Sequence, residues 1–242
     1  MNGLDLFSGI GGNTIGLRDY IDTIAYCEAD RHAQSVLLSR MAEGLLKPAP
    51  IWDDIQTLKG NQFDKQIDII IGGFPCQDIS VAGKGKGLEG KRSGLFYQVC
   101  RLVKEIKPSF VFLENVPAIR TRGLREVVRE FTDLGYDCRW ACVSAAEVGA
   151  PHLRKRWFLL AYSNKQGLQG SQDTGETSRD RSKAIKQPAG QSKVFRDNWA
   201  TEPNVGRVVD GLHLRVDRIK RLGNAVVPAQ AKEAFERLIG LK

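Results

Sequence analysis

Long apolar runs are missing from this sequence of 242 residues. A helix that crosses a bilayer needs about 18 or more consecutive apolar residues, and no such stretch occurs, so we expect no membrane span. The segment from Met1 to Asp5 also lacks the basic residues and the apolar run of a secretory signal. Both absences predict a cytoplasmic protein.

Cysteine is scarce, and its number, five, is odd. Without a secretion signal, an odd number predicts a reducing environment rather than a framework of disulfides. Cys138 and Cys142 lie four residues apart, but no histidine or second cysteine pair lies near them in the sequence. We therefore expect both thiols to pack in the core, and we expect no metal site.

Basic residues outnumber acidic ones, 36 against 28, which gives a formal net charge of +8. An excess of Lys and Arg favours a polyanionic partner, because each contact with a phosphate releases condensed counterions. The charge is typical of nucleic-acid-binding proteins without being specific to them.

The first 162 residues alternate short apolar runs with helical patterns, which predicts an α/β fold with a parallel-rich sheet covered on both faces. One expected helix places Leu37, Met41 and Leu45 on a single face at four-residue spacing. The expected strands cover 4–7, 23–27, 67–71, 110–113, 139–143 and 157–161, with Gly72-Gly73 ending the third, and the expected helices cover 13–20, 32–46, 95–106, 124–134 and 229–241.

The composition changes after residue 162. Residues 163–197 are rich in Gln, Ser, Gly, Lys and Asp and poor in aliphatic side chains, which predicts a loop or a very small module. We therefore divide the chain into a main domain (1–162), a short insert (163–203) and a C-terminal segment that returns to the main domain (204–242).

A glycine-rich turn, Asp5 to Gly12, lies between the first expected strand and helix, and Glu28 follows the next strand. Glycine lets a backbone approach a ligand closely, and an acidic residue at this distance can bind a ribose. A dinucleotide oxidoreductase is excluded, because the Gly-x-Gly-x-x-Gly pattern fails after Gly11. For the turn alone, a purely structural role is an equally good interpretation.

Two further strand ends carry residues suited to catalysis. Cys76 follows a buried strand within Gly72-Gly73-Phe74-Pro75-Cys76-Gln77, and Glu114 ends the next strand. Because parallel strands end at one edge of a sheet, the thiol and the carboxyl group should lie close together. A thiolate there could attack a substrate, and a carboxyl group beside it suits proton transfer.

Together these motifs resemble the DNA (cytosine-5)-methyltransferase family, and the end of the chain resembles its phage and prophage members. The matching elements follow the order of that family and cover most of the chain outside about 163–198. They are Asp5–Gly12, Glu28, Asp54-Ile55, Phe74–Gln77, Leu95-Phe96, Glu114–Val116, Gly149–Pro151 with Arg154 and Arg156, and Gly223–Pro228.

The resemblance implies a Rossmann-like, S-adenosyl-L-methionine-dependent methyltransferase sheet with a small, reduced target-recognition region. Cys76 would add to carbon 6 of a cytosine flipped out of the duplex, Glu114 would bind the ring nitrogen N3, and Arg154 and Arg156 would hold the base. The implied cofactor-binding residues are Phe7, Ser8, Gly9, Gly11, Gly12, Glu28, Asp54, Ile55, Pro75, Leu95, Asn224 and Ala225.

The same resemblance implies double-stranded DNA as the partner, a cognate restriction endonuclease as a further candidate partner, and a monomer. The location would be the cytoplasm of a bacterial or phage-infected cell. A basic, glycine-rich loop after Cys76 would close over the DNA through Gln77, Ser80, Lys84, Lys86 and Arg92.

Two alternatives stay open at this point. An RNA cytosine-5 methyltransferase would use the same scaffold, although the Cys-Phe-Thr signature of the RNA-acting relatives is absent. A catalytically silent DNA-binding protein would not require the intact Cys76 and Glu114.

Overall fold

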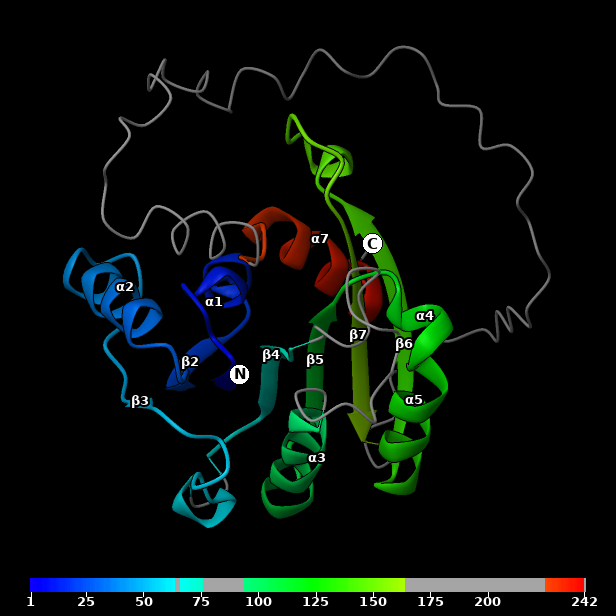
Figure 1. Cartoon of the computed structure of the whole chain (residues 1–242), viewed down its shortest axis with the longest axis horizontal. Coiled ribbons are helices and arrows are strands. Elements are labelled where there is room, and N and C mark those ends of the chain that lie inside the picture. Colours follow the sequence, from blue (N-terminus) through cyan, green and yellow to red (C-terminus); the bar gives the residue numbers. More distant parts are fainter. Residues whose placement is uncertain (64–65, 76–93, 164–224, 242) are drawn as a thin grey trace.

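A seven-stranded sheet forms the centre of the part of the protein that is described, residues 1–63, 66–75, 94–163 and 225–241 of a computed structural model. Its strand order is β3-β2-β1-β4-β5-β7-β6, and Figure 1 labels each of these strands except β1. The strands are β1 (Asn2–Leu6), β2 (Asp22–Cys27), β3 (Ile51–Trp52), β4 (Ile69–Gly73), β5 (Phe110–Asn115), β6 (Tyr136–Ser144) and β7 (Lys155–Ser163).

The sheet is mixed rather than uniformly parallel. The five strands from β3 to β5 are parallel to their neighbours, whereas β7 runs antiparallel to both β5 and β6. The expected α/β sheet is therefore confirmed, with an antiparallel hairpin at one edge. This reversal brings the start of β7 to the same edge of the sheet as the end of β5.

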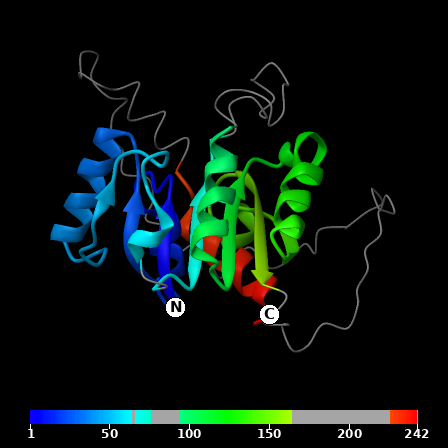
Figure 2. The same ribbon diagram turned by 90° about the horizontal axis from the view of Figure 1, so that it is seen from below.

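Helices cover both faces of the sheet, with α3 and α5 on one face and α1 and α7 on the other (Figures 1 and 2). The described helices are α1 (Gly12–Leu17), α2 (Arg31–Ala42), α3 (Leu95–Ile106), α4 (Ile119–Arg122), α5 (Leu124–Asp133) and α7 (Pro228–Ile239), with 3₁₀ turns at Gly60–Phe63 and Ala146–Val148.

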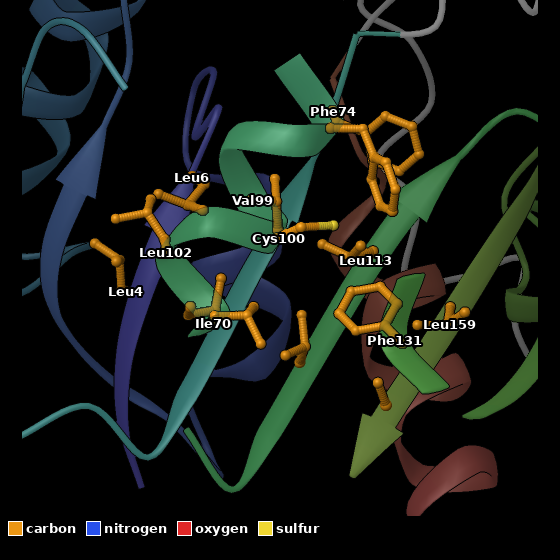
Figure 3. Close-up of a cluster of buried hydrophobic side chains, with 14 of the residues drawn as sticks. Leu4, Leu6, Ile70, Phe74, Val99, Cys100, Leu102, Leu113, Phe131 and Leu159 are labelled. Carbon is orange, nitrogen blue, oxygen red and sulfur yellow. The ribbon is translucent and has the colours of Figure 1, made fainter. Parts of the chain in front are cut away.

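Alternation along the strands decides which core each side chain enters. Ile70 packs with α3 and α5, whereas Ile69 and Ile71 pack with α1 and α7, because successive strand residues point to opposite faces. Figure 3 shows the first of these cores, in which Val99 and Leu102 of α3 meet the strand residues.

The second core joins the end of the chain to its beginning. Phe235 of α7 is fully buried, with its ring centroid 5.4 Å from that of Phe112 and 5.4 Å from that of Tyr20. Gly16 on α1 allows the start of α7 to come close, since a Cβ on Gly16 would lie 2.3 Å from the carbonyl oxygen of Pro228.

The helix expected over 32–46 is shorter than its pattern indicated. Asp30 caps α2 by accepting from the backbone N–H groups of His32 (2.9 Å) and Ala33 (3.1 Å), and the helix ends at Ala42. Gly44 then takes a φ of 74° and turns the chain. As a result, Leu46 is buried and Leu45 is 52% exposed, so the expectation for Leu45 was wrong.

The expectation that Gly72 and Gly73 end a strand was also wrong. Both belong to β4, where they pair with Leu113 and Glu114. A Cβ on Gly72 would lie 2.4 Å from the carbonyl oxygen of Leu6 on β1. The glycine pair thus allows a close approach inside the sheet.

None of the described helices is both long enough and apolar enough to cross a bilayer. Most of the insert at 163–203 lies outside the described residues, so the division of the chain into three parts stays a prediction. In the C-terminal segment, α7 packs on the sheet formed by the first 163 residues.

We predict that Phe235→Ala lowers the free energy of unfolding by about 3–5 kcal/mol, the usual cost of removing a fully buried aromatic ring. Urea denaturation followed by circular dichroism measures the change. Leu241→Ala, which truncates a side chain that is 61% exposed, serves as the control and should change stability by less than about 0.5 kcal/mol. Equal effects of the two substitutions would show that α7 does not belong to the core.

Candidate active site

The glycine-rich turn after β1 is held by bonds from both sides. The Gly9 N–H donates to Glu28 Oε2 (2.7 Å), and Ser8 Oγ donates to the carbonyl oxygen of Asp5 (2.7 Å). Gly9 and Gly11 have φ values of 53° and 81°, in the left-handed region that glycine enters without strain. A Cβ on Gly12 would lie 2.6 Å from the carbonyl oxygen of Val226, so this turn meets the C-terminal segment at close range.

Glu28 follows β2, and its carboxylate accepts hydrogen bonds from two backbone N–H groups. Its Oε2 accepts from Gly9 as described, and its Oε1 accepts from the N–H of Asp30 (2.8 Å). Each carboxylate oxygen can accept more than one hydrogen bond. The side chain can therefore brace the turn and still receive hydroxyl donors from a ligand.

Glu114 and Arg156 form an ion pair where β5 ends and β7 begins. Arg156 Nε lies 2.7 Å from Glu114 Oε1, and the two side chains are only 15% and 10% exposed. The pair joins the end of β5 to the start of β7, which the antiparallel register brings together.

The end of β4 lies directly against Glu114. Gly73 pairs with Glu114 in the register of the two strands, and a Cβ on Gly73 would lie 2.8 Å from Glu114 Oε2. Asn115 Nδ2 donates to the carbonyl oxygen of Phe74 (3.3 Å), which holds the segment after β4 in place. The ends of β4 and β5 therefore lie side by side, as expected. The described part of this segment ends at Pro75, the residue that precedes Cys76.

Burial raises the pKa of Glu114 to about 7, while the guanidinium groups of Arg156 and Arg154 oppose this rise. A carboxyl group in a dry site loses the hydration that stabilises its charged form. Glu114 can therefore gain or lose a proton near neutral pH, as a general acid or base requires.

Arg154 faces a different partner from Arg156. Its Nη2 donates to the carbonyl oxygen of Ala225 (2.6 Å), just ahead of α7. Gln230 on α7 completes this contact by donating from Nε2 to the carbonyl oxygens of Val143 (2.9 Å) and Arg154 (2.7 Å). The C-terminal helix thereby positions the hairpin that carries both arginines.

A single cavity of about 320 Å³ connects the glycine-rich turn with Glu114. This volume lies within the range of small-molecule sites, about 300–1,000 Å³. Its wall consists of Phe7, Ser8, Gly9, Ile10, Gly12, Asn13, Glu28, Asp30, Ala33, Gly73, Phe74, Pro75, Glu114, Asn115, Val116, Arg156, Ala225 and Val226.

Most residues expected to bind the cofactor line this cavity, but several do not. Gly11 faces Leu37 and Leu46 instead, Ile55 and Leu95 pack in or against the core, and Asp54 is exposed. The expected residues that lie outside the described part of the chain are Cys76, Gln77, Ser80, Lys84, Lys86, Arg92 and Asn224.

Sequence reasoning missed part of the wall. Asn13 and Asp30 carried a usable signal, because Asn13 is a polar residue directly after the glycine-rich turn and Asp30 lies two residues after Glu28. Ala33 carried none, since it has the apolar character of an ordinary packing residue, whereas Val226 lies in the matching element Gly223–Pro228 without having been named as a cofactor-binding residue. Their place in the wall depends on how α2 and the C-terminal segment fold back over the turn.

Asp5, in the same motif, is completely buried beneath the turn. Its Oδ2 accepts from Thr14 Oγ1 (2.7 Å), and its Oδ1 has no partner among the described residues. Burial raises the pKa of Asp5 to about 7, against the lowering effect of the Thr14 bond. Asp5 does not line the cavity, so its effect is on the stability of the turn.

The first 210 residues match the family described as C-5 cytosine-specific DNA methylase. Among characterised proteins, the chain is 39% identical over 159 residues to the Type II methyltransferase M.CviJI of Paramecium bursaria Chlorella virus IL3A, covering 65% of this chain and 42% of that protein. It is 32% identical over 174 residues to M.HhaI of Haemophilus parahaemolyticus, covering 70% and 51%. The chain thus spans about half the length of these relatives.

Solved structures agree with this match. A prophage-encoded protein of E. coli, described as a DNA modification methyltransferase, superposes with a TM-score of 0.58 at 29% identity, covering 71% of this chain and 49% of that one. Spodoptera frugiperda DNMT2 gives the same TM-score at 20% identity, covering 72% and 53%. This second likeness shows the fold alone.

We predict that stability falls as pH rises toward 7, because folded Asp5 keeps its proton up to about pH 7 whereas the unfolded chain loses it near 3.8. Asp5→Asn should reduce this slope by up to about 1.4 kcal/mol per pH unit. Urea denaturation at several values between pH 4.5 and 7.5 measures it. The exposed Asp133→Asn is the control, and an unchanged slope in Asp5→Asn would contradict the assignment.

Proposed function

Because this chain belongs to the C-5 cytosine-specific DNA methylase family, we propose that it transfers a methyl group from S-adenosyl-L-methionine to carbon 5 of cytosine in DNA. The observation that carries this proposal is the cavity that joins the glycine-rich turn to the Glu114–Arg156 pair. One end suits a nucleoside, and the other end suits a heterocyclic base.

The residues of the cavity fit the proposed cofactor. The wall combines an aromatic ring, exposed backbone of a glycine turn, and the carboxylate of Glu28, and Glu28 would accept the ribose hydroxyls. The backbone N–H of Glu28 donates to the carbonyl oxygen of Trp52 (2.8 Å), so Asp54 and Ile55, two and three residues further on, remain our candidates for the adenine end. When bound, S-adenosyl-L-methionine supplies an electrophilic methyl group.

Glu114 would bind the cytosine at N3 and Arg156 would hold Glu114 in place. With a pKa of about 7, the carboxyl group can donate a proton to N3 as charge develops in the ring and take it back afterwards. Arg156 keeps Oε1 occupied at 2.7 Å, which leaves Oε2, on the side of Gly73, for the base.

Cys76 is the proposed nucleophile, although it lies outside the described residues. Its thiolate would form a bond to carbon 6 of the base, and the ring electrons would then make carbon 5 nucleophilic. After methylation, loss of the carbon-5 proton and expulsion of the thiolate restore the ring. Pro75, which precedes Cys76 in the chain, lines the cavity, and this supports the assignment.

Double-stranded DNA is the proposed substrate, with the target cytosine extruded from the stack, because an enzyme cannot reach these atoms inside a duplex. Gln77, Ser80, Lys84, Lys86 and Arg92 remain the proposed DNA contacts. Monomeric action, a cognate restriction endonuclease and a cytoplasmic location also remain predictions.

We predict that Cys76→Ala abolishes methyl transfer while binding of S-adenosyl-L-methionine persists, because the thiolate acts on the base and not on the cofactor. Transfer of a tritiated methyl group to duplex DNA measures turnover, with RNA as the competing substrate. Duplex DNA that contains 5-fluorocytosine should form a covalent adduct with the parent protein only. Turnover by the Ala variant, or a preference for RNA, would contradict the proposal.

We predict that Glu114→Gln slows single-turnover methylation by about a hundredfold or more, the scale of a lost acid–base group. If the protonated carboxyl group binds N3, kcat/KM of the parent should fall above about pH 7, and the Gln variant should lack this fall. Glu147→Gln, at an exposed position in the same part of the fold, is the matched control. A rate for Glu114→Gln within a few-fold of the parent would remove Glu114 from the mechanism.

A further inference from the structure

Asn13 is a buried polar residue that the recognised motifs do not assign. It lies in the first turn of α1, is only 6% exposed and lines the cavity. Its Oδ1 is buried without a hydrogen-bond partner among the described residues. Buried carboxamides in folded proteins normally have partners, because an unmade bond leaves the cost of desolvation uncompensated.

The position in the cavity separates Asn13 from the other buried polar atoms that lack partners. Asp5, Tyr26, Trp157 and Gln230 each have such an atom, but none of these four residues lines the cavity. Among these five residues, only Asn13 therefore borders the space that a ligand in this cavity would fill. The missing partner of Asn13 is thus expected on the ligand.

The strand order places Asn13 between the two ends of the cavity. Its helix follows β1, which lies between β2, the strand that leads to Glu28, and β4, which neighbours the Glu114 strand β5. The sulfonium sulfur of S-adenosyl-L-methionine carries the ribose, the methyl group and the amino-acid chain as three separate branches. With the ribose at Glu28 and the methyl group directed toward Glu114, the amino-acid chain is the branch left to meet the wall that Asn13 forms.

We infer that Asn13 Oδ1 accepts a hydrogen bond from the α-ammonium group of S-adenosyl-L-methionine, an inference that rests on the proposed function. The ligand has three kinds of donor: the adenine amine, the ribose hydroxyls and the ammonium group. The adenine amine is assigned to Asp54 and Ile55, beyond β3, and the ribose hydroxyls are assigned to Glu28. The ammonium group is left for the acceptor on α1, and a bond to a charged donor is stronger than a neutral one.

Binding of four adenosyl ligands to three variants tests this assignment without any measurement of activity. The ligands are S-adenosylhomocysteine, its decarboxylated form, its desamino form and 5′-methylthioadenosine, so that ammonium and carboxylate are removed separately and together. The test substitution is Asn13→Leu, which keeps the shape of the side chain, with Asn13→Ala as a second variant. Thr14→Val, at the next position on α1, removes a hydrogen bond to Asp5 and does not alter the cavity wall.

Isothermal titration calorimetry should show that both Asn13 variants weaken binding of the two ammonium-bearing ligands by about tenfold to a hundredfold. The desamino form and 5′-methylthioadenosine should bind them within about twofold of the parent, and Thr14→Val should show no dependence on the ammonium group. Equal weakening of all four ligands, or weakening that follows the carboxylate, would overturn the assignment. A parent protein that bound none of the four would overturn the proposed cofactor as well.

Discussion

The ion pair between Glu114 and Arg156 is the interaction on which the arrangement of the site depends. A largely buried charge is costly when it is unpaired, so each of these two side chains stabilises the charged form of the other. Their contact at 2.7 Å requires the start of β7 to meet the end of β5. The chain between β6 and β7 must then return to this edge, where the N–H of Ala145 donates to the carbonyl oxygen of Arg154 (2.8 Å).

Close backbone contacts make the cavity possible around that pair. Gly73 allows β4 to approach Glu114, and Gly12 allows the turn after β1 to approach Val226. Through the second contact, a segment near the end of the chain becomes a wall of a pocket that begins at Phe7. The C-terminal helix therefore has two roles, filling a core through Phe235 and fixing the hairpin through Gln230.

Sequence patterns predicted elements well where local signals were complete. The helix over 95–106 is found at those same residues, because its apolar face is regular and Pro108 follows closely. The helix after Asp30 ended four residues early, since the left-handed turn at Gly44 outweighed an apolar pattern that continued to Leu45. Gly72 and Gly73 predicted a strand end. They lie inside β4 instead, because the neighbouring strands β1 and β5 leave no room there for a side chain.

The sequence by itself determined the types of chemical group at each strand end and their order along the chain, because motifs and turns depend on neighbouring residues. The antiparallel course of β7, the burial that raises the pKa of Glu114, and the separate partners of Arg154 and Arg156 were decided by the tertiary structure. So was the place of Asn13 in the cavity wall, which Asp54, Ile55 and Leu95 do not line. The physical reason is that burial and pairing depend on residues far apart in the chain, such as Arg154 and Ala225, which no local pattern brings together.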